Sequence, residues 1–349
     1  MTGPLSIPQI VELLNGRLEA LCAELLPKGK REGAEWVEAR RGAGGLGDSL
    51  KIHLGPARRG VWKHFAAGVG GDALELVRYL QTGGDKAAAI QWSRAWLGLD
   101  GADPARLDRA RRRAAAATAE RKALDREDSA RMRGAAHRLW LEAEPGIAGT
   151  PADAYLRGRG IDLARLGRQP AALRYHSRCW CAESDSYRPA MVAAIAGPKG
   201  FAAAHRTYLE ILPGGAVGKA GLKAAKKTLG RWRGGTIRLW RGASGKGLRQ
   251  APDGDVVVLT EGIEDGLTAA LHRPDFRVMA AVSVGNMANI DLPPAIGTVF
   301  LAGQRDAPGS QARHAFENAL HHFAEAGFDT MRMRPPQGAH DLNEAEQNA

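Results

Sequence analysis

The sequence predicts an α/β protein whose C-terminal part is a parallel sheet covered by helices on both faces. Short, unbroken, β-branched apolar runs alternate there with helical stretches, and glycine-containing turns separate them. Strands buried on both faces carry such continuous runs, whereas half-exposed strands alternate with polar residues. The expected strands are Asp255–Thr260, Arg277–Val282, Thr298–Ala302 and Thr330–Met333. The expected helices are Ile263–Leu271 and Ser310–Ala326, the second of which ends at Gly327.

Composition divides the 349 residues into four segments, because a chain of this length exceeds one ordinary core. Residues 1–98 combine helical pattern with a glycine-rich stretch of short strands. Residues 99–135 are rich in alanine, arginine and acidic residues, which is typical of a solvated helical linker. The alternative is that this helix lies along the phosphate backbone of a nucleic acid. Residues 136–250 form a mixed, basic α+β segment, and residues 251–349 hold the parallel sheet.

The chain is strongly basic, with 49 Lys and Arg against 38 Asp and Glu and a formal net charge of +11. Such an excess attracts polyanions, nucleic acids and nucleotides among them, although it also serves solubility or reflects compositional drift. No apolar run approaches the ~20 residues needed to cross a bilayer. Residues 1–10 lack the pattern of a signal peptide. We therefore expect a protein that has no membrane partner.

The three cysteines are Cys22, Cys179 and Cys181. A sparse, odd set argues against a disulfide framework and indicates a reducing, cytoplasmic location. Two of them form a His-x2-Cys-x-Cys pattern with His176, but a fourth metal ligand is not evident. We therefore expect these cysteines to pack as small buried residues beside Trp180.

Carboxylates follow the expected strands where each strand ends. Glu261 comes directly after the first strand, Asp306 just beyond the third, and Asp341 after the last. The carboxyl ends of parallel strands share one edge, where ligands of such sheets bind. Carboxylates at that edge suit Mg²⁺, which takes few carboxylates together with waters and phosphates. Glu264 and Asp265 open the next helix, and complementing its dipole is the simpler explanation for Asp265.

Three segments resemble the motifs of the Toprim family, which serves primases, topoisomerases and nucleases. Residues 259–265 (LTEGIED) resemble its strand-Glu-Gly motif, residues 301–309 (LAGQRDAPG) its Asp-x-Asp motif, and residues 340–343 (HDLN) a closing Lys-Asp-x-Asn segment. The resemblance implies a Rossmann-like parallel sheet, catalysis by Glu261 and Asp306, and Mg²⁺ or Mn²⁺ bound by Glu261, Asp306, Asp341 and the side-chain oxygen of Gln304. Gln304 replaces the first Asp of Asp-x-Asp, so metal binding is weaker, depends on the other acids, or is lost.

The N-terminal segment resembles the zinc-ribbon domain of bacterial and phage primases through residues 47–52 (GDSLKI) and 61–77. His64 and Ala67 stand at the two cysteine positions of that motif. A structural zinc needs about four nitrogen or sulfur ligands, so we expect a degenerate ribbon without zinc. We expect its core to contain Trp36, Trp62 and Phe65. The Gly-Asp pair before the following helix predicts an N-cap.

The basic segment resembles the N-terminal catalytic subdomain of primases at residues 154–161 (AYLRGRGI). Cations interleaved with Trp232 and Trp240 follow, a pattern that suits a single-stranded backbone with stacked bases; solvated loops around core tryptophans are the alternative. The candidate nucleic-acid and nucleotide ligands are Arg206, Lys223, Lys226, Lys227, Arg231 and Arg233.

Together these resemblances imply a primase-like nucleotidyltransferase of phage or mobile-element replication. Its implied partners are single-stranded DNA, nucleoside triphosphates and a replicative helicase. A Toprim nuclease is the enzyme alternative. A DNA-binding replication protein on a catalytically decayed scaffold is the other, and the replacement at Gln304 favours it.

Overall fold

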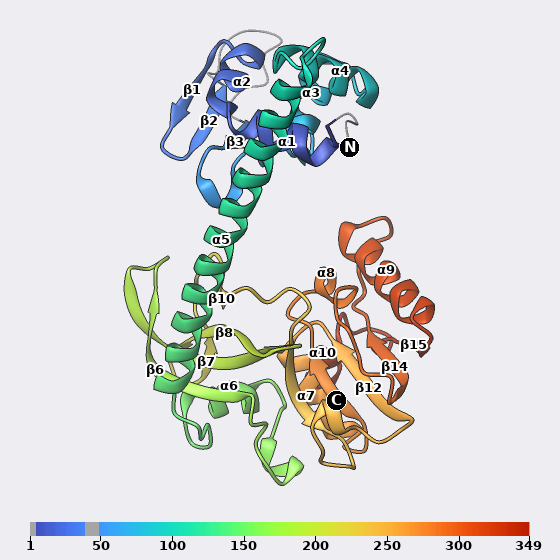
Figure 1. Ribbon diagram of the computed structural model, residues 1–349. Helices are drawn as coiled ribbons and strands as arrows, with labels where there is room; N and C mark the ends of the chain where they lie inside the picture. Colours follow the sequence, from blue (N-terminus) through green and yellow to red (C-terminus); the bar gives the residue numbers. More distant parts are fainter. Residues whose placement is uncertain (1–4, 39–48, 349) are drawn as a thin grey trace. The chain divides into compact units, whose positions relative to one another are not determined.

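The computed structural model describes residues 5–38 and 49–348, and the chain forms two compact units, Met1–Asp128 and Ser129–Ala349 (Figure 1). The long helix α5 (Pro104–Glu142) runs across the boundary between them. It contains most of the segment expected to be a helical linker, and the composition-based boundaries at residues 98, 135 and 250 remain predictions. Within the described ranges, no helix is both long enough and apolar enough to span a membrane.

The first unit packs helices against a small antiparallel sheet with strand order β1-β2-β3-β4-β5. Its buried core draws leucines from the first two helices together with Leu50, Ile52 and Trp62 of the sheet. The elements are α1 (Ile7–Asn15), α2 (Leu18–Leu25), β1 (Gly29–Glu32), β2 (Glu35–Glu38), β3 (Leu50–His53), η2 (Pro56–Arg58), β4 (Trp62–His64), β5 (Val69–Gly71), α3 (Ala73–Gln81) and α4 (Lys86–Trp96).

The two positions where the resemblance places cysteines differ in their surroundings. His64 is buried and its Nδ1 lies 2.8 Å from the Tyr79 hydroxyl, whereas Ala67 is exposed. Trp62 is buried as expected, but Phe65 is 62% exposed, so its assignment to the core was wrong. Strand β4 alternates inward and outward side chains and ends at His64, so Phe65 falls in the turn. Residues 47–48 of the predicted motif lie outside the described residues.

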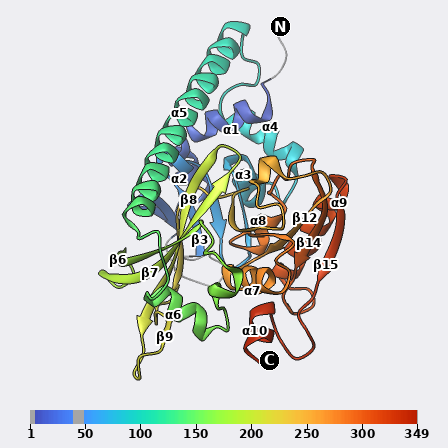
Figure 2. The ribbon, with the colours of Figure 1, turned by 90° about the horizontal axis from the view of Figure 1, so that it is seen from below.

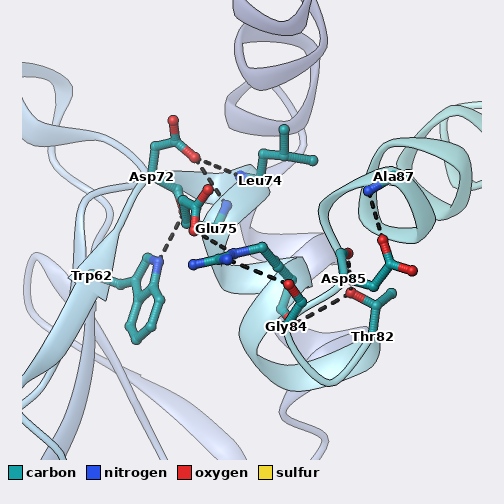
Figure 3. A network of polar contacts seen from close by, with 9 residues as sticks. Trp62, Asp72, Leu74, Glu75, Thr82, Gly84, Asp85 and Ala87 are labelled. Atoms are coloured by element: carbon teal, nitrogen blue, oxygen red, sulfur yellow. Dashed lines mark hydrogen bonds and ion pairs between the residues drawn. The ribbon is translucent and has the colours of Figure 1, made fainter.

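Helix α3 begins at the N-cap that the Gly-Asp pair predicts. The Asp72 carboxylate accepts hydrogen bonds from the backbone N–H groups of Leu74 (2.9 Å) and Glu75 (3.0 Å) (Figure 3). The Trp62 indole donates to the Asp72 carbonyl oxygen at 2.9 Å. One residue therefore joins the sheet to the helix and satisfies two otherwise unpaired donors.

We expect Asp72→Ala to lower the free energy of unfolding of this unit by about 1 kcal/mol, the usual cost of losing an N-cap. Asp72→Asn is the matched control, because asparagine caps helices about as well as aspartate. Urea unfolding followed by circular dichroism measures both variants. Equal midpoints for Asp72→Ala and the wild type would show that the cap does not stabilise the helix.

The second unit is built on a ten-stranded mixed sheet with strand order β10-β8-β7-β11-β13-β12-β14-β15, to which β6 and β9 add at β7 and β8. The pairs among β13, β12, β14 and β15 are parallel, and the others are antiparallel. The elements are α6 (Pro151–Gly158), η3 (Leu163–Leu166), β6 (Leu173–Cys181), β7 (Ser186–Gly197), β8 (Gly200–Ile211), β9 (Val217–Lys219), β10 (Lys226–Gly230), β11 (Thr236–Arg241), η4 (Leu248–Gln250), β12 (Asp255–Thr260), α7 (Ile263–His272), β13 (Arg277–Ala280), α8 (Val284–Met287), β14 (Ile296–Ala302), α9 (Gln311–Glu325), β15 (Asp329–Met333) and α10 (Leu342–Gln347).

Helices cover both faces of the parallel strands, as the sequence predicts. Val258 of β12 packs in the cluster that contains Leu267 of α7, whereas its neighbours Val257 and Leu259 pack with Phe323 of α9. Figure 2 shows α7 and α9 on opposite sides of β12 and β14. The α/β prediction for this part of the chain is therefore confirmed.

The second parallel strand ends earlier than predicted, at Ala280 instead of Val282. Val282 has a φ of 73°, in the left-handed region that β-branched residues rarely adopt. This turn ends the strand, and the short helix α8 follows where the sequence predicts only a turn. The sharp reversal places the start of α8 beside the carboxyl end of β12.

Candidate active site

Two carboxylates meet at the carboxyl edge of the parallel strands. Glu261 follows β12 and Asp306 follows β14, and these strands are paired in parallel. Burial raises the pKa of Glu261, and the negative charge of Asp306 raises it further. The backbone N–H of Val284, at the start of α8, and the charge of Lys226 act in the opposite direction. The structure thus places Glu261 and Asp306 close enough for their charges to interact.

A third carboxylate, Asp265, lies in the first turn of α7 and is buried. Burial raises its pKa to about 6, and the charges of Asp341 and Glu264 add to the shift. The backbone N–H of Asn343 donates to Asp265 Oδ1 at 3.0 Å and opposes it. Its burial and its contact with Asn343 go beyond what complementing the helix dipole requires, and a role of Asp265 in the site stays a prediction. The signal in the sequence that could have pointed to Asp265 is its position one helical turn after Glu261.

Gln304 and Asp341 both interact with this third carboxylate. The Gln304 amide is close enough to Asp265 to favour its ionised form. Asp341 Oδ1 accepts from the backbone N–H of Glu344 at 2.7 Å and caps α10. Gln304 therefore contacts a carboxylate of the site, and Asp341 combines capping with a charge next to Asp265.

The donor chemistry of this edge fits a hard divalent cation. Carboxylate and amide oxygens are what Mg²⁺ takes, and a cation would relieve the repulsion that raises the pKa of Glu261 and of Asp265. Across residues 5–38 and 49–348, no three His, Cys, Asp or Glu side chains stand close enough to hold a metal as they are. The acids form neighbouring pairs, so substrate phosphates and waters would complete the coordination. The residues that would hold the cation are Glu261, Asp265, Asp306 and Asp341, with Gln304.

Glu264 is the most enclosed charge of the site, with 4% of its surface exposed. The Tyr155 hydroxyl donates to its Oε1 at 2.7 Å, and Lys226 Nζ lies 2.8 Å from its Oε2. Burial alone would raise the pKa of Glu264, but Lys226, Tyr155 and Lys219 outweigh it and lower this pKa to about 2. Glu264 therefore stays ionised and binds the basic segment to the parallel sheet.

A second link joins the same two parts of the sheet. Arg159 Nε donates to Asn343 Oδ1 at 2.6 Å, and Asn343 Nδ2 donates back to the Arg159 carbonyl oxygen at 2.9 Å. The same amide group donates to Thr268 Oγ1 at 3.1 Å. Tyr155 and Arg159 both belong to the AYLRGRGI segment, so this segment contacts both the EGIED and the HDLN segments.

Most of the predicted nucleic-acid ligands have partners within the chain. Lys227 pairs with Glu183 at 2.8 Å, and the Lys223 backbone N–H donates to the same carboxylate at 2.5 Å. Arg233 donates to Asn289 at 2.8 Å. Arg206 donates to the Tyr208 hydroxyl at 3.0 Å. Among the six, Lys226 stands at the carboxylate edge, and all six roles in binding remain predictions.

A pocket of about 330 Å³ lies next to the carboxylate edge. Gln304 and Asp306 line it together with Arg313, Arg332 and Arg334. Arg332 is paired with Glu317 at 2.6 Å. These arginines were not among the predicted ligands: Arg313 lies in the first turn of α9, and Arg332 and Arg334 come after this helix along the chain. Guanidinium groups beside carboxylates give a place where a phosphate chain meets both arginine and a bound cation.

Cys179 and Cys181 are buried in β6 and carry free thiols, as the packing interpretation predicts. They pack in a cluster with Tyr208 and with Ala136 and Trp140 of α5. The structure thus gives these cysteines a role in the core.

Residues 256–349 match the family model of the Toprim domain, and residues 130–239 match that of a domain of unknown function, DUF7146. The chain is therefore a Toprim-domain protein, and the predicted Toprim resemblance is confirmed. No curated protein matches the sequence.

Solved structures of primases are also similar to the chain. The Aquifex aeolicus primase (zinc-binding and RNA polymerase domains) is 16% identical with a TM-score of 0.41, over 97% of this chain and 83% of that one. The primase fragment of the bacteriophage T7 primase-helicase is 19% identical with a TM-score of 0.37, over 56% and 69%. The E. coli primase catalytic core is 14% identical with a TM-score of 0.40, over 62% and 76%.

We expect Gln304→Asp to make the protein more dependent on divalent cations for stability. The new carboxylate would stand beside Asp265, whose pKa is already raised to about 6, so like charges would destabilise the metal-free protein. A bound cation would offset that repulsion. Thermal unfolding with EDTA and with Mg²⁺ should therefore show a larger Mg²⁺-induced rise of Tm than in the wild type. Gln304→Glu tests whether the distance of the carboxylate from the backbone matters. Equal Mg²⁺-induced rises of Tm in the wild type and in both variants would place residue 304 outside the cation site.

Proposed function

We propose that the protein is a DNA primase-like nucleotidyltransferase that makes short primers on single-stranded DNA. The observation that carries the proposal is the carboxylate edge of a Toprim domain, joined through Tyr155 and Arg159 to a basic neighbouring segment. The reaction is attack of a 3′-hydroxyl oxygen on the α-phosphorus of a nucleoside triphosphate. A P–O bond forms, the bond to the β-phosphate oxygen breaks, and pyrophosphate leaves.

The residues of the chain have separate tasks in this reaction. Glu261, with its raised pKa, accepts the proton of the attacking hydroxyl near neutral pH. Mg²⁺ or Mn²⁺ supplies stabilisation of charge on the attacking and leaving oxygens when it is bound. Arg313 and Arg334, in the pocket beside Asp306, orient the phosphate chain. Lys226 holds Glu264 and adds positive charge next to Glu261.

Incubation with single-stranded DNA, labelled nucleoside triphosphates and Mg²⁺ or Mn²⁺ tests the proposal, with both extension and cleavage measured. Labelled oligonucleotides that depend on template and metal support a primase. Template cleavage without synthesis would select a Toprim nuclease. DNA binding with neither reaction would select the decayed scaffold. The presence of Gln304 in place of the first aspartate of the motif favours that alternative. If the protein is a primase, we further propose that it acts in phage or mobile-element replication and has a helicase as its partner.

A further inference from the structure

A second pocket, of about 370 Å³, lies in the same unit but away from the carboxylate edge. Its floor is formed by Ala194 and Ala196 of β7 and by Arg238 of β11, and Met279 of β13 adjoins them. Arg277, at one end of the pocket, is the first residue of β13, whereas Glu261 follows the last residue of the parallel neighbour β12. The pocket therefore extends toward the end of the strands opposite to the carboxylates.

The pocket carries an excess of positive charge that the protein does not neutralise. Arg168, Arg238, Arg241 and Arg277 line it, and no aspartate or glutamate of the described ranges does. Arg277 is paired with Asp255 at 2.8 Å, and both side chains are at least nine-tenths buried. The carboxylate of Asp255 is thus already paired with Arg277.

Arg238 has an unsatisfied hydrogen-bond donor. Its Nε is buried and has no hydrogen-bond partner among the described residues. Burial and the positive charges of Arg249, Arg277 and Arg241 lower its pKa. A buried guanidinium donor without an acceptor is costly unless something else supplies one.

The remaining surface of the pocket is apolar and includes an aromatic ring. Leu239, Leu248 and Met279 line it, and the Arg168 guanidinium stacks 4.5 Å from the centre of the Trp240 ring. Sites for small organic ligands have volumes of ~300–1,000 Å³ and combine apolar walls with a few polar groups. A bare inorganic anion would leave these walls without contacts.

We propose that this pocket binds a free nucleotide, whose phosphate accepts from Arg238 and whose base and sugar contact the apolar wall. The site is separate from the carboxylate edge and needs no divalent cation. Through this site, the concentration of free nucleotide would affect the part of the sheet that joins the basic segment to the parallel strands.

Isothermal titration of the full chain with ATP in EDTA tests the site, because without a cation the carboxylate edge repels a triphosphate. Arg238→Met removes the charge at similar volume, and Ala196→Leu fills the floor without touching a charge. Arg178→Met is the matched control, since Arg178 is exposed, does not line the pocket and is not among the charges that act on Arg238. We expect both pocket variants to bind ATP about tenfold more weakly or worse, because Arg238→Met removes a charge-assisted hydrogen bond and Ala196→Leu occupies the space of the ligand. We expect the control to match the wild type.

A thymidine oligonucleotide titrated in parallel distinguishes a free nucleotide from a DNA strand. Binding of the oligonucleotide that depends on Arg238, without binding of ATP, would overturn the proposal in favour of a DNA groove. Equal ATP affinities in the wild type and both pocket variants, or no ATP binding at all, would overturn it outright. Circular dichroism melting curves verify folding, and Arg238→Met should not melt lower, because it removes a charge that burial and neighbouring arginines disfavour.

Discussion

Glu264→Gln is expected to lower the free energy of unfolding at neutral pH by about 3 kcal/mol, the scale of breaking a buried ion pair by removing one partner. Glutamine can still accept from the Tyr155 hydroxyl, so the loss falls on the interaction with Lys226 and Lys219. Both lysines are partly exposed and can turn toward water, which keeps the cost from rising further. Urea unfolding of the two proteins measures the difference.

The difference should depend on pH in a defined direction. The pKa of Glu264 is lowered in the folded protein, to about 2 from 4.5, so its stabilisation is complete above pH 4.5 and is lost as the pH falls toward 2. The two proteins should therefore become more alike in acid. The control is Glu183→Gln, which breaks the more exposed pair with Lys227 and should cost much less. Equal costs for the two variants at neutral pH would show that Glu264 does not hold the two parts of the sheet together.

The parallel strands were predictable because their signal is local. An unbroken apolar run such as Asp255–Thr260 is a property of six neighbouring residues, and burial on both faces requires it. The same reasoning placed Glu261 and Asp306 at one edge, since parallel strands end together. The end of the second strand escaped prediction because the left-handed turn at Val282 has no signature in a β-branched residue.

The contacts of the site were not predictable because they join distant parts of the chain. Tyr155 and Glu264 are 109 residues apart, and Arg159 and Asn343 are 184 apart. Nothing in either segment specifies the other, although each segment resembles a separate primase motif. The burial of Asp265 likewise depends on Asn343, so the residue looked like an ordinary helix N-terminal acid in the sequence.

The charge count likewise did not show which cations have partners within the chain. The sequence pattern counted Lys226 and Lys227 as free cations, whereas the structure pairs them with Glu264 and Glu183. An acidic residue far along the chain neutralises a basic cluster as effectively as a neighbour does. Only the fold shows which donors lack an acceptor among the described residues, and Nε of Arg238, which no sequence motif marked, is one of them.

Glu261→Gln is expected to lower the rate of metal-dependent primer synthesis by about a hundredfold or more, the usual effect of removing a general base. Asp306→Asn should lower it as well, because it removes the negative charge that interacts with Glu261 and would contact the cation. Asp291→Asn, at an exposed acid of the same domain, is the matched control and should leave the rate unchanged.

Stability separates this loss from misfolding. The pKa of Glu261 is raised in the folded protein, so its ionised form costs stability at neutral pH; that cost vanishes below its unfolded pKa. The neutral Gln side chain avoids the cost, and Glu261→Gln should therefore melt at the same temperature as the wild type or higher while it loses activity. Asp306→Asn should behave in the same way, since it removes the charge that repels Glu261. A variant that melts normally and synthesises primers at the wild-type rate would contradict the assigned role of its residue, because no fault in folding could then explain the result.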